Sequence, residues 1–333
     1  MNRPTIQFNF ETNACQQWHE FLQSEREKTF TLNQILSEIN ITPDKIFLRD
    51  KSIQLSQTAY CYSTNPGSIA FAGNVVWLNM AMASSSVSCI FTNWSSLNVF
   101  KGTLTKTTIV GNDSAEWFHL LHNKAIHKTC YPNSGNTEGF ISPNAHVDQH
   151  AIIRGPVYID DDVVVGPQTV ITGPCYIGPE SRIEECVSLG TKGIFAKKVD
   201  RVLRKFEYYG GVSIGRNSHI HARANIAASP HFRSFSTVGN NVSIGIYSNL
   251  GHDTIVQDNT TIASTACVCG HAVVGKNCWI GAGSIIRDGC CIGDNANVRI
   301  GSVVIEDVED GADISGNFAV AHKKNLREYM KRK

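Results

Sequence analysis

Branched apolar residues recur at every sixth position through the second half of this chain. The series runs from Ile141 to Leu189 and again from Ile214 to Val304, and 24 of its 25 positions are Ile, Val or Leu. Neither a helix of period 3.6 nor a simple strand of period 2 gives a pure period of six. A parallel β-helix built from hexapeptides does, with one short strand and one corner in each repeat.

A second period sets the number of sides. Asn241, Asn259, Asn277 and Asn295 lie 18 residues apart, so one coil contains three hexapeptides. Asn tolerates the positive φ that a tight corner needs, and stacked Asn side chains can hydrogen-bond to one another. Four residues after most of the large apolar positions the chain places a small side chain, which suits a narrow interior. The pattern therefore predicts a triangular prism of about eight coils.

Two stretches interrupt the prism, which we expect over 138–320. The segment 191–211 breaks the period and is predicted to leave the prism as a loop, with six Lys or Arg residues among its first fifteen or so positions. The irregular stretch 227–237 is predicted to be a smaller excursion. Residues 321–333 read as a basic helix outside the prism.

The first 130 residues show no six-residue period and are predicted to form a separate small α/β domain. A helix over 31–39 is expected to be capped by Thr31, and a helix near 75–85 is expected between two strands, SIAFAG and SCIFTN. The stretch AEWFHLLHNKAI reads as a further helix.

Composition excludes several classes of protein. The chain has 333 residues, 42% of them hydrophobic, and a net charge of +1, so neither disorder nor a general attraction to nucleic acid is expected. No stretch is apolar enough for a membrane span or a signal peptide. Eleven cysteines without paired Cys-x-x-Cys motifs indicate reduced thiols and a cytoplasmic protein.

These features together resemble a known family, the UDP-3-O-acylglucosamine N-acyltransferases of lipid A assembly. The resemblance covers about residues 30–333, and its specific motifs are IAFAGNVVW at 69–77, YYGGVSIG at 208–215, NLGHDTIVQDNTTIA at 249–263 and SGNFA at 315–319. The GHD triplet and the GNFA ending are also similar to acetyl-CoA-dependent sugar acetyltransferases. The resemblance implies a left-handed parallel β-helix and a homotrimer with active sites between prisms.

The resemblance assigns the chemistry to one corner. Its catalytic base falls on His252, and acyl transfer to an amine needs a base that titrates near neutrality. Asp253 could orient the imidazole, and the backbone N–H of Gly270, one coil further on, is assigned to the oxyanion. The alternatives are a surface histidine, a turn aspartate and a turn glycine.

Substrate and donor residues are also implied by the resemblance. Phe71, Asn74 and Trp77 match the positions that hold uridine, although the aromatic pair could simply fill the domain core. Asn249 is assigned to substrate as well. Donor binding is assigned to Gly270, Gly281 and the basic tail residues Lys323 and Lys324, whose alternative role is a solvated surface.

Departures from the family favour a different acceptor. A second family histidine corresponds to Gly289, and the loop sequence GTKGIFA lacks the family's aspartate-glycine-phenylalanine signature. We therefore expect an N-acyltransferase that takes an acyl or acetyl group from acyl-CoA, acetyl-CoA or acyl carrier protein to a nucleotide-linked amino sugar. The alternatives are an acetyl-CoA-dependent sugar O-acetyltransferase and a non-catalytic scaffold or carbohydrate binder.

No permanently bound cofactor or metal is expected. Prism-shaped carbonic anhydrases hold zinc with two histidines five residues apart on one chain, and neither His146/His150 nor His219/His221 has that spacing.

Overall fold

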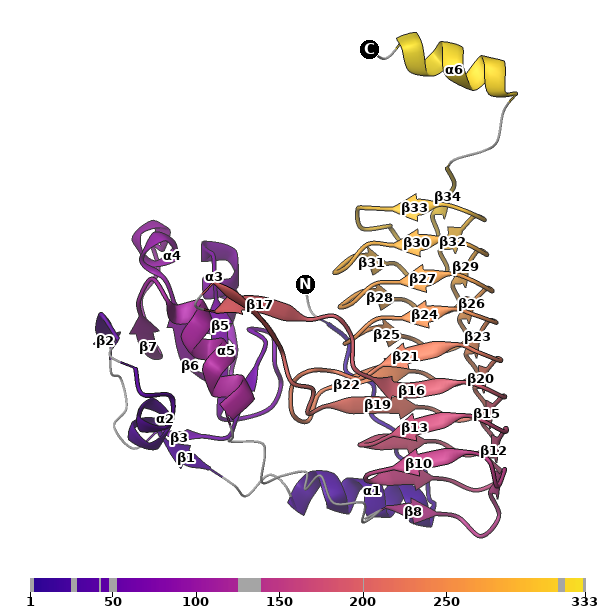
Figure 1. Cartoon of the computed structure of the whole chain (residues 1–333), viewed down its shortest axis with the longest axis horizontal. Coiled ribbons are helices and arrows are strands. Elements are labelled where there is room, and N and C mark those ends of the chain that lie inside the picture. Colours follow the sequence, from indigo (N-terminus) through magenta and orange to yellow (C-terminus); the bar gives the residue numbers. More distant parts are fainter. Residues whose placement is uncertain are drawn as a thin grey trace.

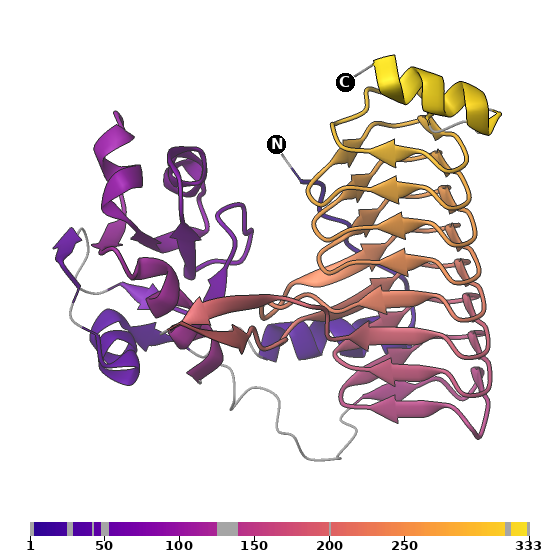
Figure 2. The same ribbon diagram turned by 45° about the horizontal axis from the view of Figure 1, so that its top comes forward.

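The computed structural model describes residues 3–24, 29–41, 43–47, 53–124, 139–199, 201–316 and 321–331. A long prism of stacked coils stands beside a smaller mixed sheet with helices, as Figure 1 shows. Turned by 45°, the molecule shows the ladder of coils from another side, with a narrow hairpin reaching from it toward the smaller sheet (Figure 2). Part of the SGNFA motif and the boundaries expected at 130, 138 and 320 lie outside the described residues.

Three parallel sheets form the sides of the prism. The first sheet contains β10 (Ile152–Arg154), β13 (Val170–Thr172), β16 (Ser188–Thr191), β21 (Asn225–Ala227), β24 (Asn249–Leu250), β27 (Cys267–Val268), β30 (Ile285–Ile286) and β33 (Val303–Val304). The second contains β8 (Phe140–Ile141), β11 (Val157–Ile159), β14 (Cys175–Ile177), β19 (Gly211–Ile214), β22 (Phe235–Val238), β25 (Ile255–Val256), β28 (Val273–Val274) and β31 (Cys291–Ile292). The third contains β9 (His146–Val147), β12 (Val164–Val165), β15 (Arg182–Ile183), β20 (His219–Ile220), β23 (Ser243–Ile244), β26 (Thr261–Ile262), β29 (Trp279–Ile280), β32 (Asn297–Val298) and β34 (Asp313–Ile314).

The interior of the prism follows the six-residue period. Each coil places one large branched residue from every sheet inside, and Ile244, Val256, Ile262 and Ile280 are fully buried. Small residues fill the remaining slots, and a representative one, Ala272, is also fully buried. The predicted left-handed parallel β-helix is confirmed.

We number the edges of the prism by the sheet that precedes them. Edge I joins the first sheet to the second, edge II the second to the third, and edge III the third to the first. The 18-residue asparagines lie on edge II with φ between 55° and 60°. The amide of Asn241 donates to Asn259 at 3.2 Å and that of Asn277 to Asn295 at 3.2 Å, which confirms the predicted ladder.

One position of the repeat is wrong. The period predicts a strand residue at Phe232, but β21 pairs with β24 and β19 with β22, so the coil between Ile214 and Val238 has 24 residues in place of 18. The extra hexapeptide bulges out at edge I, where Phe232 is buried but does not belong to the core of the prism. An aromatic side chain is too large for an interior slot filled elsewhere by Ile, Val or Leu.

The longer interruption also leaves at edge I. It forms an antiparallel hairpin of β17 (Ala196–Val199) and β18 (Val202–Lys205) that reaches the smaller sheet, as Figure 2 shows. Phe206 is buried in the apolar core of that sheet, and Phe195 packs against it. The ring of Phe206 stacks on His122 at 3.8 Å. The loop therefore ties the two parts of the chain together.

The smaller sheet has the strand order β2 (Lys45–Phe47), β7 (Thr107–Val110), β6 (Val87–Thr92), β5 (Ser68–Ala72), β4 (Gln57–Ala59), with only β2 antiparallel. Around it lie α2 (Leu32–Ile39), α3 (Val75–Ala83), α4 (Trp94–Val99), α5 (Ser114–Lys124) and the short pair β1 (Phe30–Thr31) and β3 (Gln54–Leu55). The expected helices and strands are confirmed, including the Thr31 capping box with Gln34.

Helix α1 (Asn13–Ser24) and the residues before it pack against the prism, although the sequence predicts residues 1–130 as one separate α/β domain. The helix lies along the prism beside β8 and β11, where Trp18 packs between Tyr158 and Tyr176. Thr12 Oγ1 donates to Asp160 at 2.7 Å. The aromatic residues of this segment find their apolar partners on the outer face of the first coils.

The closing helix α6 (His322–Lys331) lies beyond the last coil, as predicted (Figure 1). Among the described helices, none combines the length and the apolar character needed to cross a bilayer.

Candidate active site

Edge I brings His252 onto Gly270. Because Leu250 of β24 pairs with Val268 of β27, the residues two positions beyond them are also stacked. The imidazole of His252 covers Gly270 so closely that a Cβ on that glycine would lie 2.8 Å from Nε2. A glycine at position 270 is therefore needed, because a side chain there would collide with the imidazole of His252.

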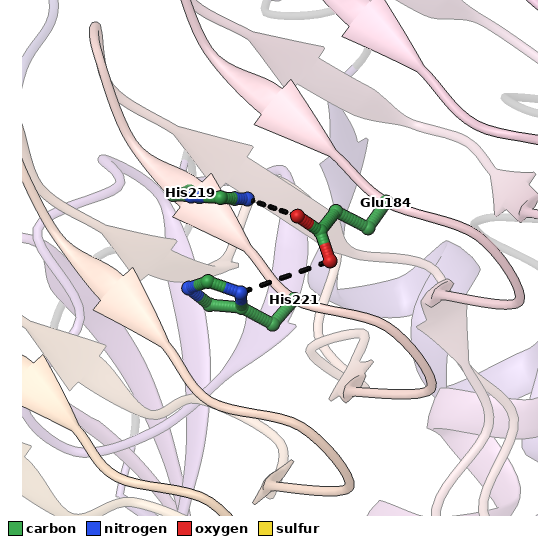
Figure 3. Close-up of side chains that lie close together, drawn as sticks. All are labelled: Glu184, His219 and His221. Carbon is green, nitrogen blue, oxygen red and sulfur yellow. Dashed lines mark hydrogen bonds and ion pairs between the residues drawn. The ribbon is translucent and has the colours of Figure 1, made fainter.

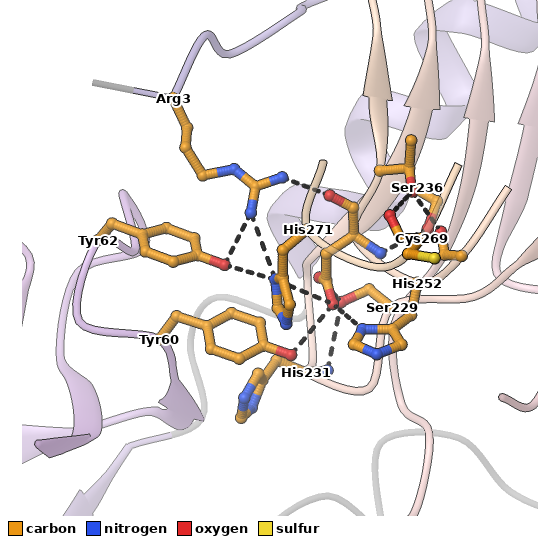
Figure 4. A network of polar contacts seen from close by, with 12 residues as sticks. Arg3, Tyr60, Tyr62, Ser229, His231, Ser236, His252, Cys269 and His271 are labelled. Carbon is orange, nitrogen blue, oxygen red and sulfur yellow. Dashed lines mark hydrogen bonds and ion pairs between the residues drawn. The ribbon is translucent and has the colours of Figure 1, made fainter. Parts of the chain in front are cut away.

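Asp253 contacts the other side of the His252 ring. Figure 4 shows the polar network around His252, with His271, Tyr60 and Ser229 close by. Its Oδ2 lies 2.9 Å from His252 Nδ1, and the same oxygen accepts from Tyr60 at 3.0 Å. Its Oδ1 accepts from Ser229 at 2.5 Å. Since a carboxylate only accepts, Nδ1 of His252 carries the proton, and Nε2 keeps a lone pair that can accept one.

His271 follows Gly270 and stacks one coil above Asp253. Both residues adopt the left-handed conformation of the corner, with φ of 58° for Asp253 and 60° for His271. A chain of donors reaches His271 from the N-terminal part: Arg3 donates to the Tyr62 hydroxyl at 2.9 Å, and Tyr62 lies 2.9 Å from His271 Nδ1. Arg3 also donates to the backbone carbonyl of Asp253.

Burial and neighbouring groups shift the pKa values of Asp253 and His271. Burial by itself would raise the pKa of Asp253, but its hydrogen bond with His252, the neighbouring histidine charges and the Ser229 hydrogen bond hold it well below its usual range. Burial lowers the pKa of His271 to about 4, against the opposing charge of Asp253. At neutral pH the site thus holds one buried carboxylate beside a neutral His271.

His231 lies in the shorter excursion and is 1% exposed. Its ring meets Tyr60 edge-on at 4.2 Å, and burial lowers its pKa to about 4. It also lines a cavity of about 360 Å³ between the smaller sheet and the hairpin. The lining is mostly apolar and comprises Ala59, Tyr60, Phe71, Ala115, Phe118, Phe195, Ala196, Phe206 and His231.

The 191–211 segment also contacts His252, through Phe195 and Tyr208. The rings of Phe195 and His252 lie 5.6 Å apart, and those of Tyr208 and His252 lie 6.4 Å apart. The side chain of His252 is 17% exposed, and it lies next to the cavity-lining Phe195 rather than in the lining itself.

The three residues expected to hold a nucleobase occupy different surroundings. Phe71 lines the cavity and packs against Phe118 at 6.1 Å. Asn74 caps α3, where its Oδ1 accepts from the Trp77 amide at 3.0 Å. Trp77 is 40% exposed and faces Tyr62 at 6.2 Å. Trp77 is thus not a core residue, whereas Phe71 belongs partly to the core.

The remaining predicted residues lie further along the prism. Asn249 is exposed on β24, just before the His252 corner, and accepts from Asn225 at 2.8 Å. Gly281 lies on edge III, where a Cβ would meet the Ile300 amide at 2.5 Å. Lys323 and Lys324 are exposed on α6. Gly281 and these lysines are therefore not brought to the His252 corner of the same chain.

His252, Asp253 and His271 are close enough to share a metal ion, since their ligand atoms lie within 4.8 Å of one another. The surrounding groups oppose a cation. The Arg3 guanidinium lies 3.3 Å from His271 Nδ1, and the Tyr62 hydroxyl occupies the same nitrogen. The donor set fits a hydrogen-bonded network around one carboxylate better than a metal centre.

Five residues of the site were not predicted from the sequence: Tyr60, Ser229, His231, His271 and Arg3. The period did contain a signal for His271, because it lies 18 residues after Asp253 and must stack on it. No period places Ser229 and His231, which lie in the excursion, or Arg3 and Tyr60, which belong to the part of the chain without repeats.

The two buried histidines make stability depend on pH. A histidine that titrates near 4 when folded and near its ordinary value when unfolded takes up its proton only in the unfolded state. The free energy of unfolding should therefore fall as pH drops from about 6.5 to 4, by up to about 1.4 kcal/mol per pH unit for each such histidine. We expect His231→Phe to flatten this slope in urea titrations, and His146→Phe, at an exposed position, to leave it unchanged. An equal slope in the His231 variant would contradict the assignment.

Comparison with known proteins gives matches to the prism. Residues 271–306 match the family described as bacterial transferase hexapeptide (six repeats). The acyl-[acyl-carrier-protein]–UDP-N-acetylglucosamine O-acyltransferase of Campylobacter concisus is 26% identical over 149 residues, which are 44% of this chain and 53% of that protein. The bifunctional protein GlmU of Enterococcus faecalis is 26% identical over 140 residues, or 41% of this chain and 30% of that protein.

A solved structure, the UDP-N-acetylglucosamine acyltransferase from Campylobacter jejuni, is 20% identical, with 58% of this chain and 78% of that chain covered and a TM-score of 0.39. The chain thus spans about half or less of the curated relatives named here. The predicted resemblance to hexapeptide-repeat acyltransferases is confirmed, and residues 271–306 contain repeats of the bacterial transferase hexapeptide type.

Proposed function

We propose that this protein transfers an acyl or acetyl group from a thioester to the amine of a nucleotide-linked amino sugar, with His252 as the general base. The observation that carries this proposal is the geometry of His252. Asp253 binds Nδ1 at 2.9 Å, and Nε2 lies over Gly270 of the next coil, which has no side chain. The relatives' names, which include an acyltransferase acting on UDP-N-acetylglucosamine, support the same class of reaction.

The reaction follows from this geometry. The sugar amine attacks the thioester carbonyl, and Nε2 of His252 takes the proton that the nitrogen loses. The Asp253 carboxylate stabilises the imidazolium that forms, since it lies within hydrogen-bond distance of Nδ1. When the tetrahedral intermediate collapses, the C–S bond breaks, and the imidazolium returns the proton to the leaving thiolate.

Gly270 has two roles in this proposal. Its lack of a side chain makes room for the His252 ring and the thioester. Its backbone N–H donates to no backbone carbonyl among the described residues, so it can donate to the oxyanion of the intermediate. An alanine would keep the N–H and remove the room.

The cavity beside His252 suits the apolar or aromatic part of a substrate. Phe71, Phe118 and Tyr60 offer ring faces and edges on which a nucleobase can pack. Strand β5, which contains Phe71, leads directly into α3, where Asn74 is the N-cap and Trp77 lies in the first turn. We assign the nucleotide end of the acceptor to this side of the site. Asn249, exposed before the His252 corner, is assigned to the sugar.

A homotrimer would complete the donor site. Gly281 lies on edge III and Lys323 and Lys324 on α6, so a second prism packed beside edge I can bring its own residues toward His252. The donor is acyl-CoA, acetyl-CoA or acyl carrier protein, all of which present a phosphate group to which lysines are attracted.

Sugar O-acylation is a second candidate, favoured by one observation. The Campylobacter concisus relative is named an O-acyltransferase. A hydroxyl is a weaker acid than a sugar ammonium group, so its attack depends more on a base supported by a carboxylate. Asp253 supplies that support here.

A thiol-release assay tests the proposal. Acetyl-CoA, longer acyl-CoA and acyl carrier protein are each combined with UDP- and dTDP-linked amino sugars and with their N-acetylated counterparts, which offer only hydroxyls. We expect thiol release with an amino sugar and a fall of about 10²- to 10⁴-fold in His252→Ala. Mass spectrometry of the product separates N- from O-acylation. The enzyme hypothesis fails if no pair releases thiol above the rate of the variant, which would favour a non-catalytic scaffold or carbohydrate binder.

Two glycine-to-alanine variants test whether the space above Gly270 is needed for catalysis. Gly270→Ala should lower kcat by about 100-fold, because a Cβ 2.8 Å from Nε2 displaces the base while the backbone N–H remains. Gly316→Ala is the control, because nothing approaches its Cβ position within 4 Å and its φ lies outside the left-handed region. Equal activity of the two variants would show that the imidazole does not need this position.

The basic tail is tested by charge reversal. Lys323→Glu with Lys324→Glu should raise the donor KM several-fold at low salt, and the difference should shrink as salt screens the charges. The KM of the acceptor serves as the internal control. An unchanged donor KM would remove α6 from the donor site.

A further inference from the structure

A second histidine cluster lies at edge III, whereas the His252 site lies at edge I. Glu184 follows β15, and His219 and His221 flank Ile220 of β20. Because Ile183 pairs with Ile220, Glu184 lies beside His221 although 37 residues separate them in the sequence. Figure 3 shows both imidazoles directed at the one carboxylate.

The three side chains are already in contact with one another. His219 Nε2 lies 2.6 Å from Glu184 Oε1, and the two imidazoles stack at 3.8 Å with an interplanar angle of 26°. His221 Nδ1 lies 3.7 Å from Glu184 Oε2, which is too long for a hydrogen bond. One imidazole nitrogen therefore faces a carboxylate oxygen without a hydrogen bond between them.

We propose that Glu184, His219 and His221 bind a divalent transition-metal ion such as Zn²⁺. Two imidazole nitrogens and one carboxylate are a common ligand set for Zn²⁺ and for other ions of the first transition row. Ligand atoms at about 2.0–2.2 Å from a tetrahedral ion lie about 3.4 Å from one another. The three ligand atoms here already lie within 4.8 Å of one another, so small side-chain rotations complete the site.

Neighbouring groups hold the ligands in this orientation. Ser243, the register partner of His219 on the next coil, lies 3.1 Å from His221 Nε2, and the Ala222 amide donates to Glu184 Oε2 at 3.3 Å. A proton on Nε2 that is donated to Ser243 leaves the Nδ1 lone pair free for a metal. Histidine ligands in metal sites are usually fixed in this way through their second nitrogen.

The surroundings differ from those of the His252 cluster. No described arginine or lysine forms an ion pair with Glu184, whereas Arg3 stands beside His271. The three side chains are 29–36% exposed, so an ion can enter without unfolding and can keep water in its open positions. Such an ion would tie together the two coils between which the 191–211 hairpin leaves the prism. The proposal does not depend on the catalytic one.

Cobalt is a suitable probe, because Co²⁺ replaces Zn²⁺ and absorbs visible light when it is bound by nitrogen and oxygen ligands. The full chain is stripped with EDTA, dialysed, and titrated with Co²⁺ by absorption and calorimetry, with Zn²⁺ as competitor. We expect one Co²⁺ per chain, displaced by Zn²⁺. Glu184→Gln, which keeps the shape of the side chain, and His219→Ala should each weaken binding about tenfold or more.

Two controls make the result decisive. His252→Ala removes a ligand from the other cluster and should keep the Co²⁺ affinity of the unchanged protein. Thermal unfolding in EDTA shows whether each variant folds, and added Co²⁺ should raise the midpoint of the unchanged protein but not that of the Glu184 variant. The proposal is overturned if the unchanged protein binds no Co²⁺, if both ligand variants bind it as tightly, or if only His252→Ala loses it.

Discussion

The in-register stacking of parallel coils is the constraint on which this structure depends. Once Leu250 pairs with Val268, every residue of one coil has a fixed neighbour on the next. That register places the His252 ring over a glycine and Asp253 under His271. A side chain at Gly270, or a shift of one residue in the ladder, would separate the base from its surroundings. The interior of branched residues holds the register because each must enter its own slot.

Edge I collects the features that the repeat does not explain. The hairpin of 191–211, the shorter excursion and the His252 corner leave the prism at this edge on successive coils. The excursion supplies Ser229 and His231, and the hairpin supplies Phe195 and the contact to the smaller sheet. Burying the Asp253 carboxylate is costly unless its oxygens are hydrogen-bonded, and Tyr60, Ser229 and His252 provide those bonds. The loops thus bury the Asp253 carboxylate at an otherwise regular edge.

Two clusters with the same kinds of ligand illustrate how neighbours decide chemistry. His252, Asp253 and His271 surround a carboxylate that is 7% exposed, with an arginine beside one imidazole. Glu184, His219 and His221 stand on an open face, where the carboxylate is 29% exposed. At the first cluster, the arginine and the hydrogen bonds that already occupy the Asp253 carboxylate favour proton transfer. At the second cluster, the ligands are partly exposed and have no positive charge beside them among the described ion pairs, which favours a cation.

The prism, the number of its sides and the position of the His252 corner can all be predicted from the repeats in the sequence. These follow from periods of six and 18, because a repeated backbone gives each repeated residue the same environment. The helices and strands of the smaller sheet were also readable from local patterns and from the Thr31 cap. The six-residue period misassigned Phe232. The excursion adds six residues to that coil, so the apolar positions after it keep the same spacing although Phe232 itself lies outside the sheets.

Contacts between the prism and the segments that carry no repeat become visible in the folded chain alone. Arg3 and Tyr60 reach Asp253 from 250 and 193 residues away, and Glu184 reaches His219 across the ejected hairpin. Their positions depend on how α1 packs along the first coils and how the smaller sheet docks against the hairpin. Such contacts are set by the matching of whole surfaces, and no local spacing in the sequence records them.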